Sequence, residues 1–149
     1  MIVRYAAYND IPEMANLLCE LFSIEDDFAV DAEKQCRGLK LLLDTPNAVV
    51  LIAEWDGRVV GMISMQSLVS TAIGEHVGLI EDMIVTHSYR EKGIGSSLLE
   101  ALIAESAKKK YGRLALGADN RNSGAIAFYQ KHGFTTSHMG LMYRLRLSY

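Results

Sequence analysis

The 149-residue chain has little proline, little cysteine and no surplus of positive charge. Two prolines are too few for a proline-rich linker or disordered segment, so an ordinary globular protein is expected. The formal net charge of −3 gives no general basis for binding nucleic acid or an anionic membrane. No apolar run approaches the ~20 residues of a membrane span, and the N-terminus lacks the apolar segment of a signal peptide.

Cysteine and histidine are also too scattered to indicate a cluster of ligands. Cys19 and Cys36 have no metal-ligand spacing, so a reduced, cytoplasmic protein is predicted. The four histidines are dispersed, which argues against a metal site. The length predicts a single domain over residues 1–149.

Apolar periodicity and turn signals divide the rest of the chain into strands and helices. Strands are expected at residues 2–7, 48–55, 58–69, 79–86 and 114–118, with a final hairpin at 134–138 and 141–147. Helices are expected at residues 11–22, 31–43, 95–110 and 122–132. The order β-α-α-β-β-β-α-β-α-β-β predicts an α/β fold (α+β) around a mixed sheet.

Short-range signals set several of these boundaries. Asp10 is expected to cap the first helix, with Glu13 as its reciprocal partner. Asp31 is expected to cap the second helix. Asp56-Gly57 is a strong signal for a two-residue hairpin turn between two strands.

The most informative stretch begins with the strand at residues 79–86. This strand carries Glu81 and Asp82 side by side, and burying two carboxylates is unfavourable, so at least one should face a cleft or water. Strict alternation puts Glu81 on the same face as Met83 and Val85, and Asp82 on the other face beside a cation.

The residues after this strand predict an anion-binding site, which we call the phosphate loop (residues 90–96). Gly93 and Gly95 precede apolar residues at helical spacing, and a helix start presents unpaired N–H groups to an anion. Arg90 and Lys92 add positive charge. The third glycine of a dinucleotide motif is replaced by Leu98, and the lysine of a Walker loop is missing. The alternative is that both glycines only allow a tight turn between strand and helix.

A second motif lies in the helix expected at residues 122–132. Asn122, Ala125 and Tyr129 are spaced i, i+3 and i+7 and share one face, and Gly133 follows as a C-terminal cap. By itself this segment is better explained as an ordinary amphipathic helix with a tyrosine at the core edge.

Taken together, the two motifs resemble those of the GNAT superfamily of acetyl-CoA-dependent N-acetyltransferases. Arg90-x-x-Gly93-x-Gly95 follows an apolar strand, and Asn122-x-x-Ala125-x-x-Phe128-Tyr129 precedes Gly133-Phe134. The element order is similar along nearly the whole chain. One departure is Glu91, where many relatives have glycine.

The resemblance implies a binding site for acetyl-CoA as co-substrate. The backbone of Met83, Ile84 and Val85 would pair with the pantetheine arm, which requires the fourth and fifth strands to splay apart. The pyrophosphate would lie on the phosphate loop, formed by Arg90, Glu91, Lys92, Gly93, Ile94, Gly95 and Ser96. The pantetheine wall would come from the last helix, through Asn122, Gly124, Ala125, Phe128 and Tyr129.

The resemblance also implies direct attack of a primary amine on the thioester, without a covalent enzyme intermediate. Glu81 matches the position of the proposed base in the spermidine/spermine acetyltransferase branch, and Tyr129 the position of the residue that protonates the leaving thiolate. The N–H of Met83 is expected to stabilise the oxyanion. For Glu81, the alternative role is to bind a cationic substrate or orient water.

The acceptor is expected to be a small-molecule amine. Glu25, Asp26 and Asp27 would suit a cationic one, although an acidic surface loop serving solubility fits them equally well. A protein or peptide N-acetyltransferase and a catalytically silent acyl-CoA-binding module are the alternatives. Homodimers are frequent in the family, and residues 141–147 are the candidate interface.

Overall fold

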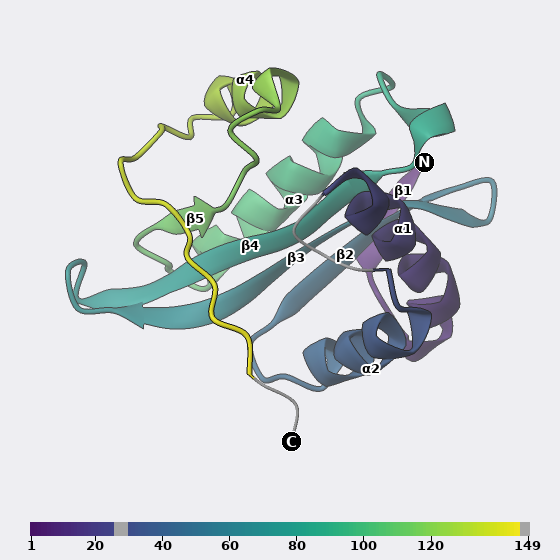
Figure 1. Ribbon diagram of the computed structural model, residues 1–149, viewed down its shortest axis with the longest axis horizontal. Helices are drawn as coiled ribbons and strands as arrows, with labels where there is room; N and C mark the ends of the chain where they lie inside the picture. The colour runs from purple at the N-terminus through teal and green to yellow at the C-terminus, as the bar shows by residue number, and fades with distance from the viewer. Residues whose placement is uncertain (26–29, 147–149) are drawn as a thin grey trace. The chain divides into compact units, whose positions relative to one another are not determined.

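The computed structural model describes residues 1–25 and 30–146. The chain forms two compact units, Met1–Leu116 and Gly117–Tyr149 (Figure 1). The first unit holds the sheet and three helices, and the second holds one helix and the C-terminal segment. No helix in the described ranges has the length and apolar character needed to cross a membrane.

The described residues of the first unit form a five-stranded sheet with the strand order β1-β2-β3-β4-β5. The strands are β1 (Ile2–Tyr5), β2 (Val49–Trp55), β3 (Arg58–Ser70), β4 (Glu75–Val85) and β5 (Leu114–Leu116). The first four strands pair antiparallel, and β5 pairs parallel to β4. The turn between β2 and β3 has positive φ at Asp56 and Gly57, as the hairpin signal predicts.

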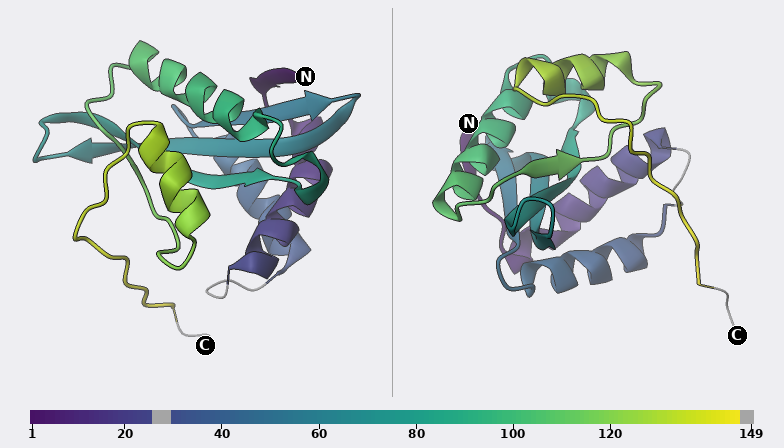
Figure 2. Two further views of the ribbon diagram at one scale, coloured as in Figure 1. Left: turned by 90° about the horizontal axis from the view of Figure 1, so that it is seen from above. Right: turned by 90° about the vertical axis from the view of Figure 1, so that its left-hand side faces the viewer.

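Helices cover both faces of this sheet. The first face carries α1 (Ile11–Ile24) and α2 (Ala32–Leu43), and α3 (Ile94–Lys108) lies on the opposite face (Figures 1 and 2). Two short 3-10 helices precede α1 and α3, η1 (Tyr8–Asp10) and η2 (His87–Tyr89). The predicted mixed α/β architecture of the sheet and its helices is therefore confirmed.

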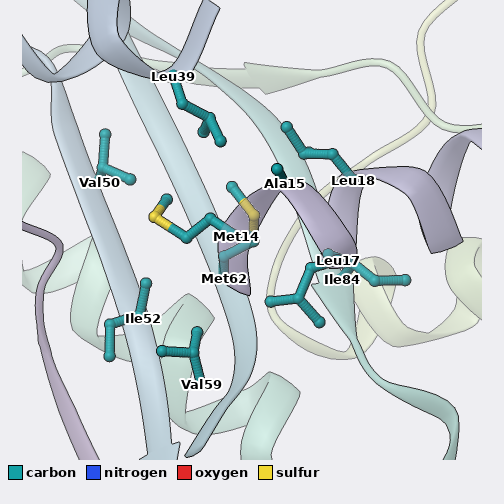
Figure 3. Packing of buried hydrophobic residues seen from close by; sticks show 10 residues of the cluster. All are labelled: Met14, Ala15, Leu17, Leu18, Leu39, Val50, Ile52, Val59, Met62 and Ile84. Atoms are coloured by element: carbon teal, nitrogen blue, oxygen red, sulfur yellow. The ribbon is translucent and has the colours of Figure 1, made fainter. Parts of the chain in front are cut away.

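The core between the sheet and α1 combines side chains from five elements (Figure 3). Met14, Leu17 and Leu18 of α1 pack with residues of the three central strands. The strand residues of this cluster are Val50, Ile52, Val59, Met62 and Ile84. On the other face, α3 buries Ile94, Leu98, Leu99 and Leu102.

The reciprocal cap predicted for α1 is wrong. Asp10 stands just before the helix, but its carboxylate accepts hydrogen bonds from the Arg4 guanidinium and from the Ala7 N–H. Glu13 instead accepts a hydrogen bond from the Val59 N–H at 2.9 Å. The charge-assisted hydrogen bonds from the Arg4 guanidinium are stronger than a bond from a neutral amide of the helix. The cap predicted for α2 is confirmed, because Asp31 accepts from the Lys34 N–H.

The predicted final hairpin is not present in the described part of the structure. Residues 134–146 form no strand, and Leu147 lies outside the described residues. The apolar side chains of Met139, Leu141, Met142 and Leu145 are exposed. Alternation of apolar residues is a local pattern, and a hairpin also needs a third strand or a helix against its apolar face to be stable in water. The alternation in this segment therefore does not by itself predict a hairpin.

Candidate functional site

The parallel pairing of β4 with β5 is short and stops near the middle of β4. It joins residues 78–80 of β4 to Leu114, Ala115 and Leu116, so that three residues pair on each side. Within the first unit, residues 81–85 of β4 have no strand beyond this point on the β5 side. The two strands thus separate around Met83, Ile84 and Val85, as the sequence predicts.

A β-bulge interrupts β4 at the start of this open stretch. Ser64 pairs with Glu81 and Met62 pairs with Ile84, so Asp82 and Met83 together oppose a single residue of β3. Asp82 takes the left-handed conformation, with φ of 55°. The buried Ser64 hydroxyl donates to the Glu81 carbonyl at 3.0 Å and so fixes the bulge from β3.

This bulge overturns the predicted orientation of Glu81. Directly paired residues share a face of the sheet, so Glu81 lies on the face of Ser64, and Ile84 on that of Met62. This is the face covered by α1, because Met62 and Ile84 belong to the core cluster with α1. Val85 pairs with Gly61, whose missing Cβ would touch Leu98 of α3, and is thus on the opposite face. The extra residue shifts the alternation, so Glu81 does not share a face with Val85.

In the part of the chain that the structure describes, the charges acting on Asp82 are those of carboxylates, and not that of the cation that was expected. Burial, followed by the negative charges of Glu81 and Glu25, raises the pKa of Asp82 from 3.8 to about 6. Glu25 stands at the C-terminal end of α1, and Glu81 is exposed. We call these three carboxylates of the first unit, Glu25, Glu81 and Asp82, the acidic trio; the charges of the first two act on Asp82. Asp26 and Asp27 lie outside the described residues.

The phosphate loop has the backbone conformation of an anion-binding helix start. Gly93 is the N-terminal cap of α3 with φ of 79°, and its carbonyl accepts from the Ser97 N–H. Helix geometry provides no acceptor within α3 for the N–H groups of Ile94 and Gly95, which open its first turn. The helix dipole adds partial positive charge at the same point.

Glu91 adopts the left-handed conformation as well, with φ of 61°. This conformation is unfavourable for a residue with a side chain and easy for glycine. Many relatives carry glycine at this position, and the backbone conformation of Glu91 in this chain also favours glycine. The Glu91 side chain is exposed.

Arg90 is held by two groups that the motif does not contain. Its Nε donates to the Val85 carbonyl at 2.9 Å, and its Nη2 lies 3.3 Å from the Glu20 carboxylate of α1. No sequence pattern indicates a role for Glu20, because it precedes Arg90 by 70 residues and the apolar stripe of α1 gives no sign of a function for the polar side of the helix.

Lys92 also contacts a distant element, since its Nζ lies 5.7 Å from the centre of the Trp55 ring at the end of β2. The Trp55 ring packs against Tyr89 of η2, with ring centres 5.8 Å apart. A cation over an aromatic face is attracted to it. Trp55 therefore contacts Tyr89 and Lys92, the two ends of the segment 89–92 that precedes Gly93.

The second motif forms α4 (Ser123–Lys131) in the C-terminal unit. Asn122 is its N-terminal cap, and its side-chain oxygen accepts from the Ala125 N–H at 3.0 Å. Because that oxygen already accepts a hydrogen bond within α4, the amide NH₂ is the group of Asn122 that can donate to a ligand. Gly124 lies in the first turn of the helix.

The C-terminal end of α4 holds Tyr129 in a defined position. The Phe134 N–H donates to the Tyr129 carbonyl at 3.1 Å and the Gly133 N–H to the Gln130 carbonyl at 3.0 Å. With φ of 93° at Gly133, this is a Schellman motif. The Tyr129 ring packs edge-on against Phe128 and Phe134, with centres 5.2 and 5.8 Å apart.

The predicted site residues thus form two groups. The first follows one path from the open stretch of β4 to the start of α3, and runs from Glu81 to Ser96. The second lies on α4, at Asn122, Gly124, Ala125, Phe128 and Tyr129. The second group has the local geometry that its motif predicts. In the first group this holds for the open stretch of β4 and the Gly93 cap, but not for Glu81 and Asp82.

Comparison with known proteins identifies what these two groups are similar to. The family model for the acetyltransferase (GNAT) family matches residues 11–134. The aminoalkylphosphonate N-acetyltransferase of Salmonella typhimurium is 30% identical over 137 residues, which cover 91% of this chain and 86% of that protein. The N-alpha-acetyltransferase 60 of Xenopus tropicalis is 30% identical over 146 residues, 92% of this chain but 60% of that protein.

Solved structures show the same fold. A putative acetyltransferase from Agrobacterium tumefaciens has a TM-score of 0.84 at 18% identity, covering 97% of this chain and 100% of that one. An aminoglycoside acetyltransferase from an uncultured soil metagenomic sample, in complex with trehalose, has a TM-score of 0.77 at 22% identity, with 99% and 96% covered.

Proposed function

Because the chain belongs to the acetyltransferase (GNAT) family, we propose that it transfers the acetyl group of acetyl-CoA to a primary amine of a small, cationic molecule. Membership in the family makes the chain an acyltransferase, and members of this family use acetyl-CoA as the acetyl donor. The proposal adds that this chain uses that donor, and names the class of acceptor.

One observation carries the donor assignment: the phosphate loop begins α3 directly after the open stretch of β4. The Gly93 cap and the first-turn amides suit the pyrophosphate, and residues 83–85 are free of a β5 neighbour within the first unit and could pair with an extended arm. Acetyl-CoA would supply the activated thioester. The Asn122 amide NH₂ is the donor that α4 can offer to a carbonyl of the pantetheine arm.

The acidic trio supports a cationic acceptor. Burial, followed by the negative charges of Glu81 and Glu25, raises the pKa of Asp82. A positively charged amine beside Asp82 would offset the effect of the two negative charges, so binding is favoured for a polyamine, a diamino acid or an aminoglycoside. The names of two similar proteins, which act on aminoalkylphosphonates and aminoglycosides, also fit a small-molecule acceptor.

The same carboxylates are candidates for the base. An ammonium cannot attack a thioester, and its reference pKa is near ~10, so a proton must leave before attack. Glu81 is exposed and stays our proposal for the base. Asp82 is the second candidate, because a pKa of about 6 lies closer to neutral pH than that of an ordinary carboxylate. Tyr129 would protonate the leaving thiolate, and the Met83 N–H would stabilise the oxyanion.

The first test is thiol release from acetyl-CoA with a panel of amines, run beside a calorimetric titration of acetyl-CoA alone. The panel holds polyamines, diamino acids, aminoglycosides, aminoalkylphosphonates and short peptides. Release with cationic amines is expected. Binding without release would favour a silent acyl-CoA-binding module, and no binding at all would refute the donor assignment.

The second test separates the two carboxylates. Glu81→Gln should lower kcat about tenfold or more and alter its pH profile if Glu81 is the base. An unchanged kcat and pH profile for Glu81→Gln, with the loss in Asp82→Asn instead, would transfer the role to Asp82. Glu33→Gln on α2 is the control, since Glu33 is exposed in the first turn of that helix.

A peptide acceptor is the second candidate function. It is favoured by the similarity to the N-alpha-acetyltransferase 60 of Xenopus tropicalis over 92% of this chain. Acetylation of short peptides but of none of the small amines would establish it in place of our proposal.

A further inference from the structure

The segment between β4 and α3 (residues 86–93, the β4–α3 connection) receives little support from its own backbone. The Thr86 N–H donates to the Val60 carbonyl of β3 at 2.8 Å. After that, the backbone bonds are two short-range ones in η2, from Tyr89 to Thr86 and from Arg90 to His87. A single turn with two such bonds does not specify one conformation in water.

Side-chain contacts from α1 provide the missing support, and they come from one residue. The Glu20 carboxylate accepts from the Thr86 hydroxyl at 2.8 Å and from the His87 N–H at 2.9 Å. It also faces the Arg90 guanidinium at 3.3 Å. Three donors spread over five residues of the β4–α3 connection therefore converge on one carboxylate.

An open cleft of about 240 Å³ lies beside this carboxylate. Asn16 and Leu17 of α1 line one side, and Thr86, Ser88 and Tyr89 line the other. The β4–α3 connection is thus not packed tightly onto α1 here. Its position relative to α1 depends on the polar contacts of Glu20 rather than on apolar packing.

We propose that Glu20 is a positioning residue for the cofactor: it sets the conformation of the β4–α3 connection, and through it the phosphate loop that begins at Arg90. The inference rests on the proposed function, because it assumes that this loop binds the pyrophosphate of acetyl-CoA. Glu20 acts through Thr86, His87 and Arg90. It also pairs with the positive charge of Arg90.

Glu20→Ala removes all three contacts, so the loop samples other conformations and binding must reorder it. The dissociation constant and the KM for acetyl-CoA should rise about tenfold, while kcat at saturating acetyl-CoA changes less than about twofold. Glu20→Gln can keep its oxygen on the His87 N–H and donate its NH₂ to the Thr86 hydroxyl, so it loses only the ion pair and should restore affinity to within about threefold of the wild type.

Glu13→Ala is the matched control. Glu13 is also a glutamate of α1 that accepts a backbone N–H of a distant segment, but that segment is Val59 of β3 and not the β4–α3 connection. Glu13→Ala should lower the free energy of unfolding to an extent similar to that of Glu20→Ala, and should leave the KM for acetyl-CoA unchanged. Equal increases of KM in Glu13→Ala and Glu20→Ala would mean that loss of stability alone explains the effect, and would overturn the proposal.

Amide hydrogen exchange of the ligand-free protein keeps this inference separable from the proposed function. Faster exchange at His87 and the residues up to Gly93 in Glu20→Ala, but not in Glu13→Ala, is expected. Unchanged exchange and unchanged acetyl-CoA affinity in Glu20→Ala would overturn the positioning role. A wild-type protein that does not bind acetyl-CoA would instead overturn the proposed function, whatever the exchange shows.

Discussion

The β4–α3 connection and α4 carry the two motifs of this chain, and they are stabilised in opposite ways. The β4–α3 connection depends on side chains from distant elements. The Glu20 carboxylate of α1 accepts two hydrogen bonds from it, at 2.8 and 2.9 Å, and the Trp55 ring of β2 packs against Tyr89. The α4 helix depends on itself, through the Asn122 cap and the Schellman motif at Gly133.

This difference predicts where the effect of a substitution in each part of the candidate site will appear. A change in α4 should act at the changed residue and within a turn of it. A change in β4 or in the β4–α3 connection should act through another element, because the partners lie on other strands and helices. The following variants test this contrast, in order of decreasing effect.

Tyr129→Phe should produce the largest loss, and it should be confined to chemistry. The ring keeps its packing against Phe128 and Phe134, and only the hydroxyl is removed. If Tyr129 protonates the thiolate, kcat falls roughly ten- to a thousandfold, while the dissociation constant for acetyl-CoA hardly changes. Stopped-flow thiol release and calorimetry measure the two quantities. A kcat within twofold of the wild type would exclude the acid role.

Asp82→Asn should raise stability at neutral pH while it impairs the candidate acceptor site. A pKa raised from 3.8 to about 6 means that the folded state binds the proton more tightly than the unfolded state. Stability of the wild type therefore falls as the pH rises through the window from about 4 to 6, and the penalty is fully present at pH 7. Removing the charge should stabilise the protein by about 1–2 kcal/mol at pH 7, after allowance for solvent screening.

The Asp82→Asn comparison is made by urea unfolding at pH 7 and at pH 4. Asparagine tolerates the left-handed conformation, so φ of 55° poses no obstacle. The gain should vanish at pH 4, where the wild-type carboxyl is protonated in the folded state. A variant that is less stable than the wild type at pH 7 would show that Asp82 has a favourable partner.

Asn122→Ala should destabilise α4 by about 1 kcal/mol, because the Ala125 N–H loses its acceptor. Asn122→Asp is the matched variant: it keeps an acceptor for that N–H but has no NH₂ donor. Faster amide exchange along α4 is expected for alanine and not for aspartate. Weaker acetyl-CoA binding is expected for both, and unchanged affinity in Asn122→Asp would remove Asn122 from the proposed cofactor site.

Glu91→Gly should have the smallest effect on stability. Glycine relieves the left-handed conformation at φ of 61°, worth roughly 1 kcal/mol, but loses more backbone entropy on folding, so a net change of only a few tenths of a kcal/mol is expected. Removing an exposed carboxylate from the phosphate loop should strengthen acetyl-CoA binding about two- to threefold.

Glu91→Gln is the control for that variant, since it removes the charge and keeps the backbone strain. Calorimetry at low and high salt measures both, and the gain in affinity should shrink as salt rises. If Glu91→Gly binds more tightly and Glu91→Gln does not, the backbone conformation and not the charge limits affinity.

Local patterns in the sequence were sufficient for much of the fold. The Asp56-Gly57 turn, the Asp31 cap, the glycine before α3 and the end of α4 at Gly133 all follow from interactions between residues a few positions apart. The prediction failed where a residue of another element binds the same side chain. Asp10 and Glu13 do not form the reciprocal cap, because their carboxylates accept hydrogen bonds from Arg4 and Val59.

The order of elements up to α4, the family and the turns at Gly93 and Gly133 follow from the amino-acid sequence alone, because hydrogen bonds within a turn or a cap depend only on neighbouring residues. How the site is held and charged depends on the tertiary structure. One extra residue opposite β3 moved Glu81 to the face of α1, and burial beside two carboxylates raised the pKa of Asp82. Glu20 reached the β4–α3 connection from 66 residues before Thr86. Such effects arise when the sheet pairs and the helices pack, and no local pattern encodes them.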